Sequence, residues 1–169
     1  MNQPAVAEST QVRGPIELTS FAHVSLPCRD LEEGIRFYVH VLGGKLMFTV
    51  PGYAAVNIAG IQFGLGTAGC SFIAAAKEYP HIAFYVTAPE MVHMRRWLEH
   101  CGIPVSNLWT RTGAEALMFF RDPSNNLIEL YCRSGYEGAA DLPRGDARRS
   151  DAADVEGLYY SRWTLPPGD

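Results

Sequence analysis

The sequence predicts an α+β fold: two strand–helix–three-strand (βαβββ) modules whose curved, mixed sheet forms a cup with the helices on its outside. An internal repeat predicts this fold. The repeat is visible in the spacing, since His23 lies 20 positions before Gly43 and His81 lies 21 positions before Gly102. Each histidine stands in an alternating segment, and each glycine ends an amphipathic segment. Short strand-like runs separated by turn residues follow both glycines. Since each helix can cover only one face of its sheet, the uncovered faces of the two modules would curve toward each other.

The first module starts with a strand at residues 21–26 whose side chains alternate between two faces. Ala22, Val24 and Leu26 share one face, and Phe21, His23 and Ser25 share the other. Asp30 and Glu33 have the spacing of a capping box, which predicts the start of a helix. Its apolar stripe is Leu31, Ile35, Tyr38 and Leu42. Three strands are expected afterwards, at residues 45–50, 53–58 and 61–65.

The second module repeats this pattern from residue 81. His81, Ala83 and Tyr85 share one face of its first strand, opposite Ile82, Phe84 and Val86. Thr87 and Glu90 predict a second capping box, and Pro89 suits a first helical turn. Met91, Met94, Leu98 and Cys101 form the stripe of this helix. Strands are expected at residues 105–109 and 115–120, and a last strand follows a turn.

That turn, Asp122 to Asn126, fixes the register of the last strand. Proline presets φ at position 123, and Asn125 and Asn126 tolerate the left-handed region. In the strand that follows, Ile128, Leu130 and Cys132 point one way, and Glu129, Tyr131 and Arg133 point the other. A carboxylate in the middle of a strand is rarely buried without a partner, so Glu129 needs one.

Composition narrows the class of protein. The chain has 169 residues, 47% of them hydrophobic, and a net charge of −4. The sequence has no run of basic residues that would indicate binding to nucleic acid, and no apolar run is long enough to span a membrane. Four scattered cysteines without a C-x-x-C pair favour free thiols in the cytoplasm. We expect a disordered lead-in at residues 1–17, one domain at 18–133 with modules at about 18–66 and 80–133, and a C-terminal extension at 134–169. The extension either packs on the domain or a dimer partner, or is disordered.

A candidate metal site follows from the inward faces. His23, His81 and Glu129 all fall on the inward phase, and the two histidines stand at matching points of the repeat. Two imidazoles and one carboxylate, with positions left open, are typical of Fe(II) sites and also suit Mn, Co or Zn. Each residue alone would more often be structural. The remaining histidines, His40, His93 and His100, are expected to be solvated on the helices.

Other inward residues are weaker candidates. Gln62 is a possible fourth ligand, although an amide oxygen binds metal less well than a carboxylate. Tyr85 and Tyr131 are candidate catalytic residues that could act as general acids. Arg133 could bind a substrate anion, and Ser25, on the inward face of the first strand, is a possible substrate-binding residue.

Four segments of the sequence resemble the vicinal oxygen chelate superfamily, which includes glyoxalase I, extradiol dioxygenases, fosfomycin-resistance enzymes, methylmalonyl-CoA epimerase and bleomycin-binding proteins. These segments are residues 23–31, 37–44, 81–86 and 122–131. The resemblance covers about residues 18–133 and implies paired βαβββ modules, a divalent metal held by His23, His81 and Glu129, and a homodimer. Asn125 stands where the family's turn usually has glycine.

The resemblance leaves the reaction open. We narrowly favour an Fe(II) dioxygenase-like enzyme acting on a small molecule, although such enzymes use an additional histidine that this sequence does not offer on its inward faces. The alternative is a glyoxalase- or epimerase-type lyase or isomerase using Mn, Ni, Co or Zn. A further alternative is a binding protein that sequesters a small molecule.

Overall fold

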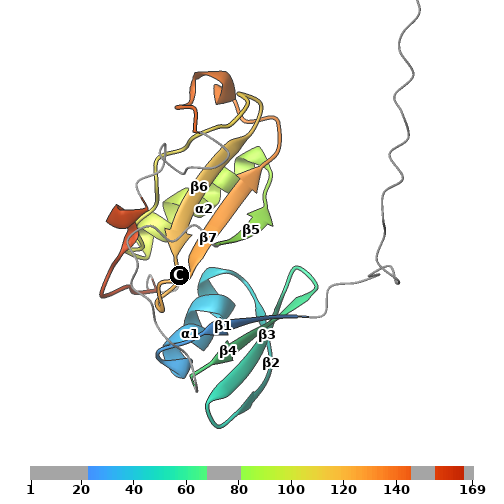
Figure 1. Ribbon diagram of the computed structural model, residues 1–169, viewed down its shortest axis with the longest axis vertical. Helices are drawn as coiled ribbons and strands as arrows, with labels where there is room; N and C mark the ends of the chain where they lie inside the picture. The colour runs from blue at the N-terminus through green and yellow to red at the C-terminus, as the bar shows by residue number, and fades with distance from the viewer. Residues whose placement is uncertain (1–22, 68–80, 146–154, 166–169) are drawn as a thin grey trace, which may run out of the picture.

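Two open sheets, each accompanied by one helix, make up the part of the chain described by a computed structural model, residues 23–67, 81–145 and 155–165 (Figure 1). Sheet A belongs to the first module and sheet B to the second. The elements of sheet A are β1 (His23–Pro27), α1 (Leu31–Arg36), η1 (Phe37–Val41), β2 (Lys45–Val50), β3 (Tyr53–Ile58) and β4 (Ile61–Gly66). Those of sheet B are β5 (His81–Tyr85), α2 (Ala88–His100), β6 (Ala116–Arg121) and β7 (Leu127–Cys132). Two short 3₁₀ turns follow, η2 (Ala139–Asp141) and η3 (Glu156–Leu158).

The predicted repeat is confirmed by the strand order. Sheet A has the order β1-β4-β3-β2, and sheet B has the order β5-β7-β6. In both sheets the first strand lies at one edge and pairs in parallel with the last strand. The other pairs are antiparallel. The two modules therefore share one topology and form the predicted mixed α+β fold, with a separate sheet for each module.

The first helix differs from the prediction in its second half. An α-helical segment, α1, passes into a π-helical turn, η1, where the Leu42 N–H donates to the Phe37 carbonyl oxygen at 3.2 Å. This wider turn lets the adjacent residues Phe37 and Tyr38 both face the core, with Val41 buried beside them. Asp30 caps the helix as predicted. The Glu33 side chain instead accepts a hydrogen bond from Trp163.

The second helix matches its prediction closely. Thr87 and Glu90 form a reciprocal capping box, and a proline stands in the first turn. Met91, Leu98 and Cys101 are buried against sheet B. The apolar face of β7, with Ile128, Leu130 and Cys132, packs on this side in the same core.

The prediction of a strand at residues 105–109 is wrong. This segment makes only isolated bridges to β6, at Val105 and Trp109. Between them the Ser106 hydroxyl accepts a hydrogen bond from the backbone N–H of Phe119 at 2.9 Å and donates to the Asn107 carbonyl oxygen. A side chain thus replaces part of the backbone ladder, and the segment is irregular.

The turn between β6 and β7 joins the two modules. Asp122 is buried and accepts hydrogen bonds from Ser124 N, Asn126 N, the Asn126 side chain and the Tyr38 hydroxyl. The Asn126 side chain also donates to the Pro27 carbonyl oxygen, at the end of β1. Burial raises the pKa of Asp122 to about 6, although the hydrogen bonds favour its charged form. Asn125 has φ of 73°, the left-handed conformation predicted for it.

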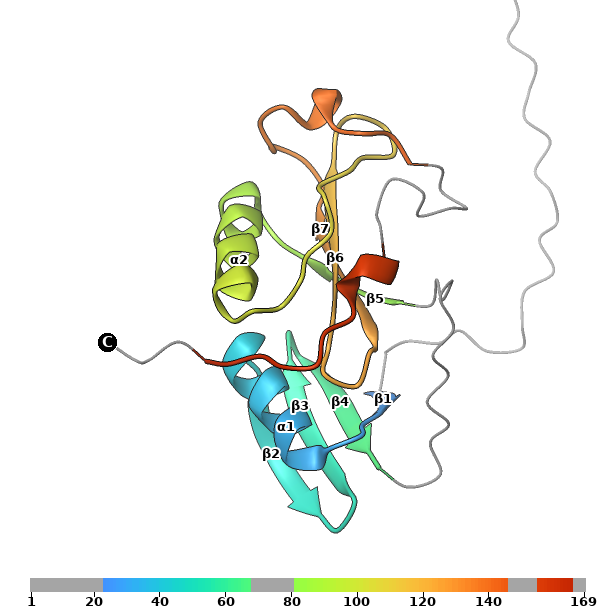
Figure 2. The same ribbon diagram turned by 90° about the vertical axis from the view of Figure 1, so that its left-hand side faces the viewer.

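The described part of the C-terminal segment packs on both modules. Trp163 lies against Phe37 with ring centroids 5.9 Å apart, and its neighbour Thr164 donates a backbone hydrogen bond to Cys101. η3 packs on sheet B from the side opposite α2 (Figure 2). The predicted lead-in and Phe21 lie outside the described residues. Among the helices in the described ranges, none is long and apolar enough to cross a membrane.

Candidate metal centre

The first strand and the last strand of sheet B bring His81 and Glu129 together. The parallel register pairs Ala83 with Glu129, so His81 lies diagonally across from the carboxylate. His81 Nε2 stands 3.1 Å from Glu129 Oε2, and the His81 ring packs edge-on against Phe119. The Glu129 side chain is only 2% exposed, on the face of β7 that α2 does not cover. The predicted inward phase of both residues is confirmed.

This pair suits a divalent metal ion. Glu129 Oε1 is buried and accepts no hydrogen bond from the described residues, although the Arg111 guanidinium lies 3.5 Å away, so this oxygen keeps its lone pairs for a metal ion. Two ligands that bind one ion at about 2.1 Å and at right angles lie about 3 Å apart, close to the observed separation of the His81 and Glu129 atoms. Nitrogen and carboxylate donors also match the preferences of Mn, Fe, Co and Zn.

His23 does not join this pair within one chain. It stands on β1 of sheet A, where it is exposed and pairs with Gln62 of β4. Across the described ranges, no three histidine, cysteine, aspartate or glutamate side chains gather in one place. Gln62 is half-exposed beside His23, and its equivalent in sheet B is Leu127, which pairs with His81. Gln62 is therefore not the counterpart of Glu129.

A cation not predicted from the sequence lies next to Glu129. Arg111 Nη2 is 3.5 Å from Glu129 Oε1, and the guanidinium lies over the rings of Trp109 and Tyr131 at 5.1 and 5.9 Å. Its side chain is 25% exposed, so it reaches both the buried carboxylate and open space. The distance is too long for a hydrogen bond, and Arg111 acts on Glu129 as a nearby charge.

The loop that carries Arg111 is held by Glu115. The Glu115 carboxylate accepts hydrogen bonds from the backbone N–H groups of Arg111 and Thr112 and from the Thr112 hydroxyl. Burial alone would raise the pKa of Glu115, but these hydrogen bonds outweigh it and lower the pKa to about 2. No periodic pattern marks such a loop, which explains why the sequence did not reveal Arg111.

A cavity of about 440 Å³ opens over this group of side chains. It is lined by His81, Ala83, Phe84, Tyr85, Arg111, Glu129 and Tyr131. Tyr85 is 71% exposed, and its hydroxyl oxygen accepts a hydrogen bond from Arg133 at 2.6 Å. Tyr131 packs edge-on against Tyr85. Of the predicted site residues, four line the cavity: His81, Tyr85, Glu129 and Tyr131. Arg133 reaches it only through Tyr85, and Ser25 lies on sheet A with His23.

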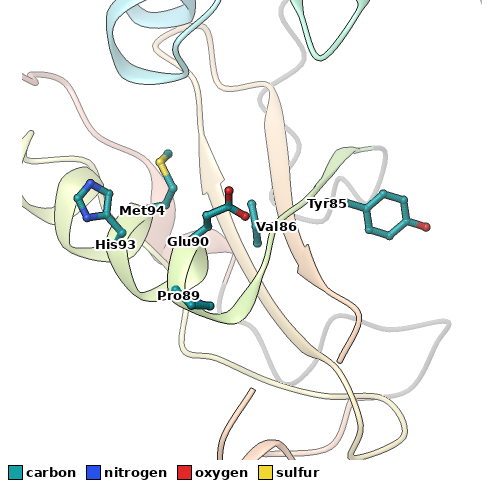
Figure 3. Close-up of a pocket in the computed structure, with 6 residues that line it drawn as sticks. All are labelled: Tyr85, Val86, Pro89, Glu90, His93 and Met94. Carbon is teal, nitrogen blue, oxygen red and sulfur yellow. The ribbon is translucent and has the colours of Figure 1, made fainter. Parts of the chain in front are cut away.

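A second cavity, of about 520 Å³, lies between the end of β5 and α2 (Figure 3). Its carboxylate, Glu90, is engaged in the capping box, and the hydrogen bond from the Thr87 N–H lowers the pKa of Glu90. The Tyr85 ring projects away from the helix, while His93 sits on α2 (Figure 3). The side chains here do not converge as His81, Glu129 and Arg111 do.

The three cysteines in the described part of the chain offer no competing chemistry. Cys28, Cys101 and Cys132 are free and buried, in agreement with the prediction of free thiols; Cys70 lies outside the described residues. Burial raises the pKa of Cys28 to about 11, so this thiol is not a nucleophile at neutral pH. The remaining histidines, His40, His93 and His100, are exposed as predicted.

Comparison with known proteins identifies a family. Residues 20–130 match the family model described as the Glyoxalase/Bleomycin resistance protein/Dioxygenase superfamily.

Solved structures share the fold. A fosfomycin resistance protein, FosX, of Listeria monocytogenes in complex with Mn(II) and sulfate is 21% identical with a TM-score of 0.61, and the match covers 73% of this chain and 96% of that one. A lactoylglutathione lyase of Agrobacterium tumefaciens is 22% identical with a TM-score of 0.57, covering 68% and 93%. A glyoxalase/bleomycin resistance protein/dioxygenase of Alicyclobacillus acidocaldarius is 26% identical with a TM-score of 0.57, covering 72% and 94%.

Proposed function

Because this chain belongs to the glyoxalase/bleomycin resistance protein/dioxygenase superfamily, we propose that it is a divalent-metal-dependent enzyme that binds a small anionic substrate through adjacent oxygen atoms. The observation that carries the proposal is the pair of His81 and Glu129, which lines a cavity and has one buried carboxylate oxygen that accepts no hydrogen bond from the described residues. The Mn(II) in the similar FosX structure supports Mn(II) as the first ion to test.

The third ligand in this proposal is His23 of a second copy of the chain. Within one chain His23 is exposed on β1 and apart from the pair. Among the described strands, both β1 and β5 lie at the edge of their sheet, and such edges favour association. A two-fold related dimer would bring sheet A of each copy against sheet B of the other and form two identical sites.

Arg111 favours an anionic substrate. Its guanidinium stands beside Glu129 and is a quarter exposed toward the cavity, so it can neutralise a carboxylate, phosphate or enolate oxygen. A divalent ion bound by the three ligands would act as a Lewis acid that polarises a substrate oxygen. Tyr85 accepts its hydrogen bond from Arg133, which leaves the Tyr85 O–H proton available to a substrate oxygen.

These residues support a lyase or isomerase better than the Fe(II) dioxygenase favoured by the sequence. The chain has five histidines, and His40, His93 and His100 lie exposed on helical segments away from the cavity. After His23 and His81 are used as ligands, no histidine remains to serve as an acid–base group. A proton next to the polarised oxygen would instead move through Glu129 or a tyrosine hydroxyl. The dioxygenase reaction stays a prediction.

The test is metal binding followed by complementation between chains. We expect Mn(II) to bind the wild-type protein, measured by the loss of the free-ion electron paramagnetic resonance signal, and His81→Ala to abolish binding. His23→Ala and Glu129→Ala should each bind poorly alone. Refolded together they should recover about a quarter of the wild-type sites, because only mixed dimers contain one intact site.

Two outcomes contradict the proposal. Unchanged Mn(II) binding by His81→Ala would show that the metal site is wrong. Mixed dimers that form but recover no binding would show that His23 does not act across the interface. Oxygen uptake with catechol after loading with Fe(II) would favour the dioxygenase reaction, whereas no uptake is expected here.

A further inference from the structure

The two sheets differ at one position that the repeat makes equivalent. On sheet B, Ala83 pairs with Glu129, two residues along β5 from His81. On sheet A, Ser25 pairs with Gly64, two residues along β1 from His23. Gly64 thus occupies the same position relative to His23 that Glu129 occupies relative to His81. Sheet A therefore lacks the carboxylate that would mirror Glu129.

A tyrosine hydroxyl fills the space that a side chain at Gly64 would take. A Cβ atom at Gly64 would overlap the Tyr53 hydroxyl and would lie 2.8 Å from the ring carbon that bears it. Tyr53 pairs with Gly66 of β4, and its ring also approaches the Cβ position of Gly66, at 3.8 Å. Tyr53 comes from β3, the strand next to β4 in sheet A (Figure 1). The ring runs along β4 over two glycines, and any larger residue at position 64 would force it away.

The hydroxyl lies on the face of sheet A that carries His23. Gln62, Gly64 and Gly66 alternate with Phe63 and Leu65, which are buried in the core with α1. Since His23 pairs with Gln62, it shares the face of Gln62 and Gly64. The arrangement is therefore a histidine and a phenol on one face of sheet A, and a histidine in contact with a carboxylate on sheet B.

We propose that the Tyr53 hydroxyl contacts an oxygen atom of the substrate at the metal centre to which His23 contributes. This rests on the proposed function, because only that site brings His23 to a metal. A phenol donates a hydrogen bond where a carboxylate could only accept one. Sheet A therefore supplies a donor for a negatively charged oxygen, opposite the Glu129 and Arg111 side of the cavity. The substrate class that fits is a small dianion with vicinal oxygens, held by Arg111 from one chain and Tyr53 from the other.

The test uses oxalate, a dianion with adjacent oxygen atoms, as the probe on the Mn(II)-loaded protein. We expect Tyr53→Phe to bind Mn(II) as the wild type does but to bind oxalate about tenfold more weakly, the effect of one hydrogen bond to a charged group. Gly64→Ala should weaken oxalate binding at least as much, because it displaces the ring. Tyr136→Phe, a half-buried tyrosine outside both sheets, is the matched control and should change neither affinity.

The outcomes separate this inference from the proposed function. If His81→Ala abolishes Mn(II) binding while Tyr53→Phe binds oxalate like the wild type, the metal site stands and the role of Tyr53 is wrong. If the wild type binds no Mn(II), or His81→Ala still binds it, the proposed function and this inference both fail. A purely structural role for Tyr53 would change Mn(II) affinity or dimer formation along with oxalate binding, and that result also contradicts the inference.

Discussion

Replacing Arg111 with methionine should change the affinities for metal and for anion in opposite directions. The Arg111 guanidinium stands beside Glu129 Oε1, at 3.5 Å. A divalent ion that binds Glu129 has to compete with this cation. Arg111→Met removes the competitor and keeps an unbranched apolar stem of similar length over Trp109. Mn(II) should therefore bind more tightly, whereas oxalate should bind the loaded protein more weakly.

The size of the effect follows from the distance and the exposure. Two unit charges 3.5 Å apart attract each other by roughly 5 kcal/mol at an effective dielectric constant of 20. Arg111 is a quarter exposed, and solvent screening reduces this attraction to about 1–2 kcal/mol. Since 1.4 kcal/mol is a factor of ten, we expect Mn(II) to bind about 5- to 30-fold more tightly.

The assay is an Mn(II) titration followed by paramagnetic resonance, with wild type and variant at one pH and one ionic strength. Arg133→Met is the matched control, because Arg133 contacts Tyr85 and makes no ion pair with Glu129 among the described residues. The reasoning is refuted if Arg111→Met leaves the Mn(II) affinity unchanged, or if Arg133→Met tightens it as much.

Three further predictions concern stability and the loop. Glu115 has a pKa lowered to about 2, so its contribution to stability is present above its ordinary pKa of 4.5 and is lost as the pH falls toward 2. Between about pH 5 and 2 the wild type should lose about 2–3 kcal/mol more than Glu115→Gln in urea unfolding, and equal losses would contradict this. Asp122→Ala removes four hydrogen bonds to a buried carboxylate and should cost about 2–4 kcal/mol; a cost below about 1 kcal/mol would show that the turn is dispensable. Chelation of bound metal should lower the melting temperature of the wild type but not that of His81→Ala, as measured by calorimetry.

Much of the fold could be predicted because its signals are local and repeated. Alternation located the first strand of each module and the faces of β7, and the capping box located the start of α2. The segment at residues 105–109 failed because the Ser106 side chain takes over a backbone hydrogen bond of β6. The π-helical turn at Phe37–Val41 was missed for a related reason, since a period of 3.6 does not indicate where a helix widens.

The candidate site was predicted in part. His81 and Glu129 could be identified because strand phase determines which face a residue occupies, and the structure brings these two together. Arg111 could not, since the irregular loop held by Glu115 has no periodicity. Tyr53 could not either, because its position depends on the absence of a side chain at Gly64, on a neighbouring strand. Contacts that depend on an irregular loop or on a missing atom leave little trace in a sequence pattern.

η3 packs on sheet B although it lies outside the residues that match the family. Val155 and Leu158 cover Leu117, Phe119 and Leu127, on the face of the sheet that carries Glu129. This segment follows residue 130, where the match to the family ends. The candidate ligands His81 and Glu129 and the η3 residues that cover the same face of sheet B thus come from separate stretches of sequence. Substitutions in the extension can therefore alter the packing behind β6 and β7 without changing His81 or Glu129.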